Sequence, residues 1–283
     1  MRGFAAGRSL DSATVGFLTD IVGRVRRDLE MRPLDEGALM ARCLALPPAR
    51  DFAGALRSEP SPAVIAEVKR ASPSAGSIAD VDSRSQAAAY ERAGAAAISV
   101  LTEPHHFHGS LADLRSVHLV TRLPVLRKDF LIHPAQLMEA RAGGADAALL
   151  IAGTVSASEL HALLATAEDL GLATLVEAHA ERELAEAVES GAPVIGVNAR
   201  NLETLEMDED RALELLATVP SHRVRVFESG IGSREQVERA VDAGADAVLV
   251  GEALMRAEDP GAFLSELRGL APGRGTPPGA PPA

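Results

Sequence analysis

Two lysines stand out in a chain that otherwise uses arginine. Of its 28 basic residues only Lys69 and Lys128 are lysines, and its only asparagines are Asn198 and Asn201. A lysine ammonium is compact and can lose its proton, whereas an arginine, with a pKa above about 12, cannot. Codon bias with two accidental survivors is the alternative explanation. We interpret the two lysines as sites where chemistry requires an ammonium rather than a guanidinium.

Three glutamates accompany the lysines at the ends of short apolar runs, namely Glu67, Glu177 and Glu228. Glu67 and Lys69 are two residues apart, so they point to the same side of an extended strand. Lysines and carboxylates held together shift one another's pKa values, as proton transfer requires. A single glutamate at a strand end can equally be a structural ion-pair partner. The whole set, together with Asn198, favours a catalytic site.

Two glycines predict where a phosphate binds. Gly230 and Gly251 follow the last two apolar runs, where many barrels bind phosphate through backbone N–H groups and a helix N-terminus. Ser72 and Lys69 could close this site from the first run. Either glycine alone is typical of an ordinary turn. The pair at these two positions favours a phosphate site.

A histidine-rich stretch at residues 104–108 resembles a metal-binding tract. No companion set of ligands accompanies it in the sequence, and a solvated loop explains it. We therefore expect no metal site.

The elements that must position these residues form an alternating pattern. Short apolar runs alternate with stretches of helical period, which predicts a parallel sheet. Gly-Ala-x recurs four times, at separations of 50, 47 and 53 residues, and each separation fits two strand–helix units. Eight such units in about this length predict an α/β fold of the (β/α)8 TIM-barrel type. The alternative is an open doubly wound sheet, but no Gly-x-Gly-x-x-Gly follows the first run. The expected strands are 63–68, 96–101, 124–126, 147–151, 173–176, 194–197, 224–227 and 247–250.

The chain divides into three parts. Residues 1–60 carry helical patterns at 15–29, 37–45 and 51–56, so they predict an N-terminal helical extension packed on the barrel. The catalytic barrel is expected to cover residues 61–270. The Pro/Gly-rich residues 271–283 are expected to be a disordered tail.

Composition and charge indicate which kinds of partner the protein can bind and in which cellular compartment it acts. A net charge of -12 argues against a nucleic-acid or anionic-membrane partner, although a local site can still attract an anionic small molecule. One cysteine, Cys43, allows no intrachain disulfide and indicates a reducing compartment. No signal-peptide pattern or membrane-length apolar run is seen, so we expect a cytoplasmic protein. The sequence does not determine the oligomeric state; of the two, we expect a monomer rather than an oligomer.

Seven motifs in register resemble those of the indole-3-glycerol-phosphate synthase family. Each motif alone is weak, but their common order over residues 18 to 270 is specific. The matching segments are 65–76 (IAEVKRASPSAG), 100–111 (VLTEPHHFHGSL), 126–130 (LRKDF), 175–177 (LVE), 196–202 (GVNARNL), 228–231 (ESGI) and 250–255 (VGEALM).

The resemblance implies a reaction and a role for each site residue. The reaction is closure of 1-(2-carboxyphenylamino)-1-deoxyribulose 5-phosphate to indole-3-glycerol phosphate, with loss of carbon dioxide and water and with no cofactor. Lys128 would be the general acid and Glu177 the base of the later dehydration, while Lys69 would assist with the substrate carboxylate. The other implied roles are positioning by Glu67, Asn198 and Glu228; binding of the substrate and its phosphate by Ser72, Arg200, Ser229, Gly230, Gly251 and Glu252; and an anthranilate pocket formed by Pro73, Phe107 and Phe130.

Two departures and two alternatives complete the interpretation. The N-terminal extension has no Trp or Tyr to cover an aromatic ring, which leaves Phe17 for that place. Phe227 stands before Glu228 where a small residue is expected, and strand alternation predicts that it faces the helices. Another phosphate-binding barrel, a phosphoribosylanthranilate isomerase, would need a Cys at a strand end, but Cys43 precedes the first strand. A non-catalytic barrel would have lost site residues, and none is missing.

Overall fold

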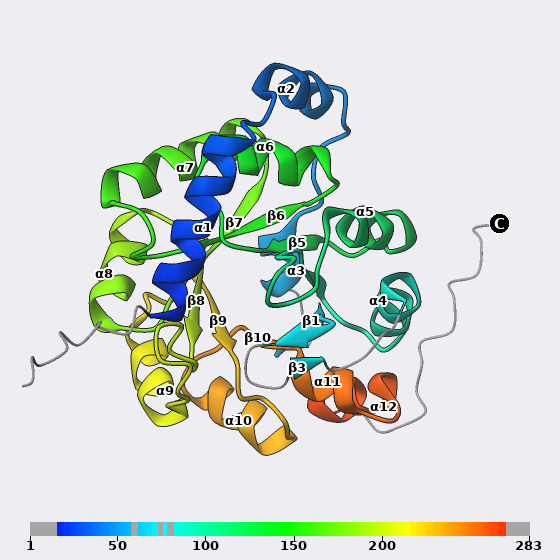
Figure 1. Ribbon diagram of the computed structural model, residues 1–283. Coiled ribbons are helices and arrows are strands. Elements are labelled where there is room, and N and C mark those ends of the chain that lie inside the picture. Colours follow the sequence, from blue (N-terminus) through cyan, green and yellow to red (C-terminus); the bar gives the residue numbers. More distant parts are fainter. Residues whose placement is uncertain (1–15, 58–61, 73–75, 78–81, 270–283) are drawn as a thin grey trace, which may run out of the picture.

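The computed structural model describes residues 16–57, 62–72, 76–77 and 82–269, and in it eight parallel strands close into a barrel. The order around the barrel is β1-β10-β9-β8-β7-β6-β5-β4, so the first strand pairs with both the second and the last strand of the barrel (Figure 1). The predicted TIM barrel is confirmed, and the open sheet is wrong. The barrel strands are β1 (Ala63–Val68), β4 (Ala97–Leu101), β5 (Val125–Lys128), β6 (Ala147–Ile151), β7 (Ala173–Ala178), β8 (Val194–Asn198), β9 (Val224–Glu228) and β10 (Ala247–Val250).

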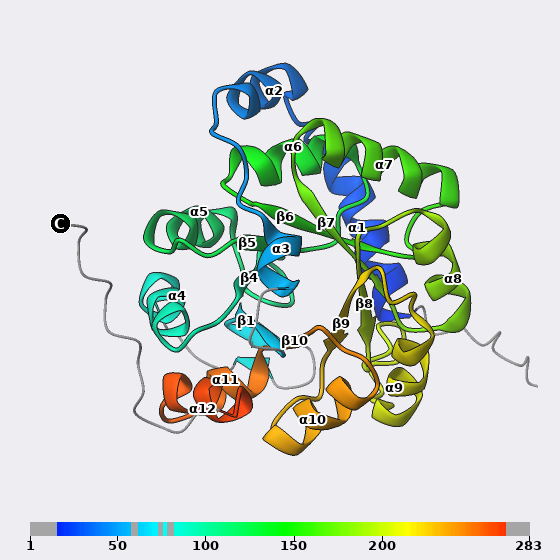
Figure 2. The ribbon, with the colours of Figure 1, turned by 180° about the vertical axis from the view of Figure 1, so that it is seen from behind.

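Helices follow the strands and surround the barrel (Figures 1 and 2). Serine side chains cap two of these helices: the Ser156 hydroxyl accepts the Glu159 N–H in a full capping box, and the Ser233 side chain accepts the Gln236 N–H before β10. The glycine of each Gly-Ala-x repeat has a positive φ, between 83 and 99°, just past a helix end. The surrounding helices are α4 (Ser83–Arg92), α5 (Leu111–Val120), α6 (Pro134–Ala142), α7 (Ala157–Asp169), α8 (Glu181–Glu189), α9 (Glu209–Thr218), α10 (Arg234–Asp242), α11 (Glu252–Arg256) and α12 (Pro260–Leu267).

Side-chain alternation along the strands produces two separate cores. On β1, Val64 and Ala66 belong to the apolar layer between strands and helices, whereas Ile65 belongs to the barrel interior. Phe227 on β9 is 1% exposed and packs in the helix layer, as alternation predicted. Glu228, the next residue, therefore faces the barrel interior.

The described part of the N-terminal extension contacts both ends of the barrel. Helix α1 (Phe17–Met31) crosses the end where β6 and β8 finish: Arg26 donates to the Thr154 carbonyl, and the Phe17 N–H donates to the Glu203 carbonyl (Figure 1). Helix α2 (Glu36–Leu44) lies against α6.

Helix α3 (Phe52–Arg57) fills the opposite end of the barrel (Figure 2). Its Phe52 and Leu56 are at most 1% exposed and join the interior core. Burial of each such side chain contributes about 1.5–3 kcal/mol. Among the described residues, α3 thus closes one end of the interior, and the pocket opens at the carboxyl ends of the strands.

A short hairpin was not predicted. Strands β2 (Ala71–Ser72) and β3 (Gly76–Ser77) pair antiparallel just after β1. Pro73 and the predicted tail at 271–283 lie outside the described residues, so their predictions stay untested. No helix in the described ranges is long and apolar enough to cross a membrane.

Candidate active site

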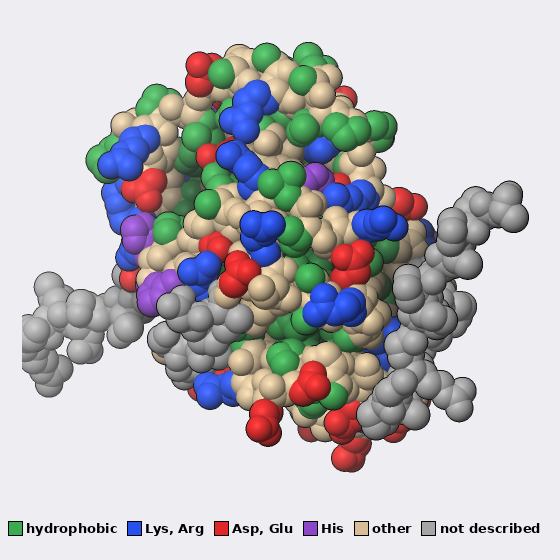
Figure 3. All heavy atoms as spheres, turned by 90° about the vertical axis from the view of Figure 1, so that its right-hand side faces the viewer, with side chains coloured by type: hydrophobic (Ala, Val, Ile, Leu, Met, Phe, Trp, Pro, Cys, Tyr) green, Lys and Arg blue, Asp and Glu red, His purple; other side chains and the backbone are tan. Residues whose placement is uncertain are grey.

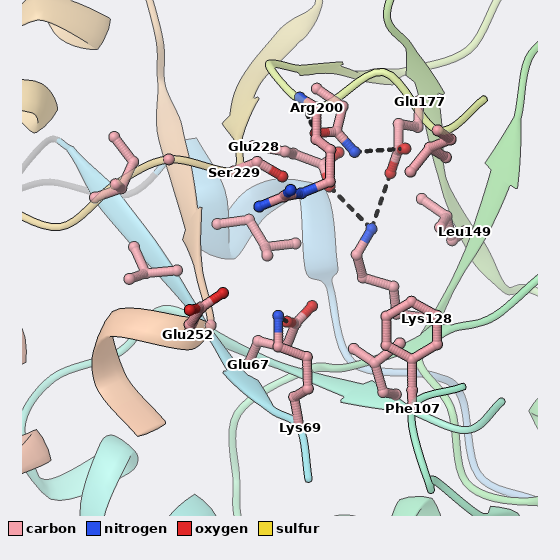
Figure 4. Close-up of a pocket in the computed structure, with 18 of the residues that line it drawn as sticks. Glu67, Lys69, Phe107, Lys128, Leu149, Glu177, Arg200, Glu228, Ser229 and Glu252 are labelled. Carbon is pink, nitrogen blue, oxygen red and sulfur yellow. Dashed lines mark hydrogen bonds and ion pairs between the residues drawn. The ribbon is translucent and has the colours of Figure 1, made fainter. Parts of the chain in front are cut away.

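A pocket of ≈ 370 Å³ opens at the carboxyl ends of the strands, between the barrel and α1. Its lining combines an apolar wall with the charged residues singled out in the sequence (Figure 4). Thirteen of the predicted site residues line it: Glu67, Lys69, Phe107, Lys128, Phe130, Glu177, Asn198, Arg200, Glu228, Ser229, Gly230, Gly251 and Glu252. The structure therefore gathers residues from seven strands or strand ends at one place.

Lys128 lies between two buried carboxylates. Its Nζ is 2.8 Å from Glu177 Oε2 and 3.2 Å from Glu228 Oε2, and Figure 4 shows the three side chains pointing toward one another. The two carboxylates are 2% and 1% exposed, whereas the lysine side chain is 15% exposed. Asn198 Nδ2 donates to Glu177 Oε1 at 2.8 Å, so both oxygens of Glu177 have a donor. The amide thus fixes the carboxylate that faces the lysine.

Burial and charge set the protonation of this cluster. Burial alone would lower the pKa of Lys128, but the carboxylates of Glu177, Glu228 and Glu67 outweigh it and raise that pKa. Burial also acts on Glu177, but Lys128 and the bond from Asn198 reverse its effect and lower the pKa of Glu177. Burial, with the charge of Glu177 and against that of Lys128, raises the pKa of Glu228 to about 8. These shifts favour an ammonium at Lys128 and a carboxylate at Glu177, and they favour the protonated form of Glu228.

Lys69 has a separate partner. Its Nζ is 3.2 Å from Glu67 Oε1, on the side of the pocket formed by β1 (Figure 4). Glu67 is 3% exposed, and its Oε2 has no hydrogen-bond partner among the described residues. The prediction that Glu67 and Lys69 share a side of their strand is confirmed. Each lysine of the chain thus has its own carboxylate partners.

The predicted phosphate end lies where β1, β10 and β9 are neighbours. Ser229 and Gly230 follow β9 with φ of 69 and 80°, a left-handed turn that directs the backbone into the pocket. Gly251 is the N-cap of α11, and Glu252 opens that helix. Ser72 belongs to β2, and the structure describes its backbone but not its side chain. The strands therefore converge as predicted, while phosphate binding itself stays a prediction.

An aromatic wall faces the lysines. The rings of Phe107 and Phe130 have centroids 6.4 Å apart, and both rings line the pocket. Phe17 of α1 lines the same pocket and makes an edge contact with His106, with centroids 5.0 Å apart. The sequence pointed to Phe17 for this place, and the structure puts it there.

The histidine-rich stretch is held as a loop by a buried carboxylate. Glu103 accepts the backbone N–H groups of His105, His106 and Phe107 at 3.0, 2.6 and 3.1 Å. These bonds fix Phe107 at the pocket wall. Within the ranges that the structure describes, no group of three or more His, Cys, Asp or Glu side chains could hold a metal ion.

Sequence reasoning missed two residues of this site. Arg256 lines the pocket and donates from Nε to Glu252 Oε1 at 3.0 Å. Its spacing of four residues from Glu252 on a helix is a signal that could have found it. Gly196 lies on β8 two residues before Asn198, so it also faces the interior, but nothing in the sequence distinguishes it from an ordinary strand glycine.

Comparison with known proteins decides the family. The family model described as indole-3-glycerol phosphate synthase matches residues 18–267. The chain belongs to this family. An indole-3-glycerol phosphate synthase of Rhodococcus opacus (strain B4) is 47% identical over 253 residues, covering 88% of this chain and 94% of the relative. One of Mycobacterium avium (strain 104) is 47% identical over 261 residues, covering 91% and 95%. Membership makes this chain a carboxy-lyase of tryptophan biosynthesis that acts on a small phosphorylated, sugar-like substrate.

Solved structures agree on the fold. A 3-hexulose-6-phosphate synthase superposes with a TM-score of 0.60, at 16% identity, over 74% of this chain and 100% of that one. At this identity the likeness shows the barrel alone. The assignment of the family therefore rests on the sequence comparisons.

Proposed function

We propose that this chain closes the indole ring of indole-3-glycerol phosphate with Lys128 as general acid and Glu177 as general base. One observation carries the assignment: Lys128 Nζ lies 2.8 Å from Oε2 of the buried Glu177, and both side chains line the same pocket. The raised pKa of Lys128 keeps that group protonated, and the lowered pKa of Glu177 keeps that group deprotonated, which are the states in which an acid and a base begin the reaction.

The reaction uses these two groups in sequence. The carboxylated ring carbon of the substrate attacks the carbonyl carbon of the sugar, and Lys128 donates its proton to the carbonyl oxygen as the carbon–carbon bond forms. Carbon dioxide then leaves from the same ring carbon, which restores the aromatic ring. In the last step Glu177 takes a proton from the carbon beside the nitrogen, while the new hydroxyl accepts a proton from the Lys69 ammonium and leaves as water; solvent then restores the protons of the two lysines. The double bond of the indole is thereby completed, and no oxidant or reductant is needed.

The remaining residues bind and orient. The rings of Phe107 and Phe130 suit the flat anthranilate ring, and Lys69 suits its carboxylate. The turn at Ser229 and Gly230 and the start of α11 offer backbone N–H groups to the phosphate. Glu228, protonated at neutral pH, can donate a hydrogen bond to a substrate hydroxyl or hold Lys128 in place.

The proposal also covers the oligomeric state, the cellular compartment and the binding partners of the protein. It includes a monomer that acts in the cytoplasm, without a metal or an organic cofactor and without a nucleic-acid or membrane partner. The net charge of -12 supports the last point. On the face shown in Figure 3, basic and acidic side chains of the described residues are interspersed rather than gathered by sign.

A direct assay tests the function. Purified protein is mixed with 1-(2-carboxyphenylamino)-1-deoxyribulose 5-phosphate in EDTA, and the indole fluorescence of the product is followed. We expect turnover by the wild type and a loss of about 10²–10⁴-fold in kcat for Lys128→Gln. A folded wild type that releases neither carbon dioxide nor an indole product would overturn the proposal. Gel filtration of the same sample tests the monomer.

A further inference from the structure

Two glycines on the inner face of the barrel stand where a side chain would enter the site. Gly196 on β8 is two residues before Asn198, so it faces the interior, and Gly251, the N-cap of α11 just after β10, lines the pocket. Neither has a φ in the left-handed region, so their backbone conformations do not require glycine. A glycine inside a strand weakens it, unless another group needs the space. The reason for glycine at both positions is therefore space.

The space beside Gly196 is occupied by the carboxyl group of Glu228. A Cβ at Gly196 would lie 2.1 Å from Glu228 Oε1 and 3.2 Å from its Cδ, whereas ordinary contacts are 3.4–4 Å. The other side is no freer, because the same Cβ would be 3.2 Å from Leu175 Cδ1. Glu228 is 1% exposed but lines the pocket, so the space left for a displaced carboxyl group is the substrate pocket itself. Any larger residue at position 196 must displace this group.

The displaced carboxyl group is the one that holds Lys128. Glu228 Oε2 is 3.2 Å from Lys128 Nζ, and Oε1, the atom nearest to the missing Cβ, has no hydrogen-bond partner among the described residues. Because the two oxygens belong to one rigid group, moving Oε1 by about 1 Å also moves Oε2. The contact with Lys128 would then be lost or redirected.

At Gly251, too, the place of a missing side chain is taken by a glutamate that pairs with a lysine. A Cβ at Gly251 would lie 2.2 Å from Glu67 Oε1, the oxygen that is paired with Lys69 at 3.2 Å. Each lysine of the site is therefore paired with a glutamate whose carboxyl group occupies the place of a missing side chain, at Gly196 on β8 or at Gly251 at the start of α11. Two independent positions with one geometry indicate a shared function.

We propose that Gly196 and Gly251 are positioning residues, whose missing side chains reserve the volume in which Glu228 and Glu67 hold the two lysines. The inference rests on the proposed function, because it concerns the geometry of the proposed acid. It assigns Gly196 no contact with substrate, and for Gly251 it adds a role to the backbone contact proposed with the phosphate. It predicts that the effect of enlarging Gly196 depends on the length of residue 228.

A double-mutant cycle tests this dependence. The four proteins are the wild type, Gly196→Ala, Glu228→Asp and the double variant, with Gly37→Ala as a matched control. Gly37 is exposed on α2, and a Cβ there would meet only Asp35 Oδ1, at an ordinary 3.5 Å. Aspartate is one methylene shorter, so its carboxyl group withdraws from position 196. For each protein kcat, KM and the thermal midpoint are measured.

We expect Gly196→Ala to lower kcat by about tenfold or more with KM changed less than about threefold, and to lower the thermal midpoint. In the Glu228→Asp background the same substitution should change kcat less than about threefold and leave the midpoint nearly unchanged. Gly37→Ala should leave kcat and KM as in the wild type. A role in strand packing alone would lower the midpoint in both backgrounds equally and leave kcat unaffected.

Additive effects in the two backgrounds, or a folded Gly196→Ala enzyme with normal kcat, would overturn the proposal. If Gly196→Ala does not fold, the double variant decides: folding with the activity of Glu228→Asp supports the proposal, and failure to fold overturns it. A wild type without turnover would refute the proposed function separately, since the midpoints still report the contact between positions 196 and 228.

Discussion

Replacement of Lys128 by arginine separates its charge from its ability to release a proton. In the wild type the ammonium lies 2.8 Å from Glu177 and 3.2 Å from Glu228, and both carboxylates are almost fully buried. Lys128→Arg keeps the positive charge between them, so attraction for an anionic substrate persists. The guanidinium is planar, larger and almost never deprotonated, so it is a poor acid.

The expected loss of kcat follows from the role of Lys128 as general acid. A positioned general acid contributes about 10²–10⁴-fold, or about 3–5 kcal/mol of the activation barrier. We therefore expect Lys128→Arg to lower kcat by about 10²–10⁴-fold and to change KM only about threefold. This is the pattern of an interaction made mainly in the transition state. Fitting the larger group into the closed site also lowers stability by about 1–3 kcal/mol.

Lys69→Arg is the matched control. The side chains of Lys69 and Lys128 are 14% and 15% exposed, and each is ion-paired with a buried glutamate. Steady-state kinetics by indole fluorescence, with circular dichroism to verify folding, compare the two variants. We expect Lys69→Arg to keep kcat within about tenfold of the wild type. Near-normal kcat in Lys128→Arg would refute the reasoning, and a large loss in Lys69→Arg would transfer the acid role to Lys69.

Three further predictions concern the pH dependence of stability, the affinity for substrate and the dependence on metal. The folded pKa of Glu228, about 8, exceeds its ordinary value of 4.5, so its contribution to stability is complete below pH 4.5 and is lost as pH rises through 8. Urea unfolding should show the wild type losing up to about 5 kcal/mol relative to Glu228→Gln over this window, and parallel curves would contradict the assignment. Phe17→Ala should raise KM roughly tenfold, because it removes part of the pocket wall; an unchanged KM would place the substrate away from α1. Turnover should persist in EDTA, since the proposed proton transfers use only side chains; loss on chelation with recovery on adding zinc would show a metal requirement.

Much of the fold was predictable because the signals are local. Each apolar run is a strand whose length and alternation are set by its own residues, so all eight strands were found within two residues at each end. The barrel end that carries the site follows from strand direction, and the scarcity of Lys and Asn pointed to the charged cluster. Phe227 was assigned to the helix layer by alternation alone.

The pairing inside the site was not predictable, because it depends on barrel closure. Which carboxylate meets which lysine is decided by the stagger between strands: Lys128 on β5 contacts Glu177 on β7 and Glu228 on β9 across the interior. The reason for glycine at position 196 is the carboxyl group of Glu228, on β9, which lies where a Cβ would be. No pattern along β8 itself contains that information. The β2–β3 hairpin was missed because its two-residue strands show no periodicity.

The position of α1 over the barrel mouth has a consequence for folding during synthesis. The Thr19 hydroxyl donates to Glu203, a partner 184 residues later in the chain. At a synthesis rate of about 5–20 residues per second, α1 leaves the ribosome roughly 10–40 s before that partner exists. During this interval the apolar side of α1, with Leu18, Ile21 and Val22, has no barrel to pack against. The helix that completes the pocket is thus made well before the residues on which it docks, so its apolar side must stay in solution without aggregating until they have been synthesised.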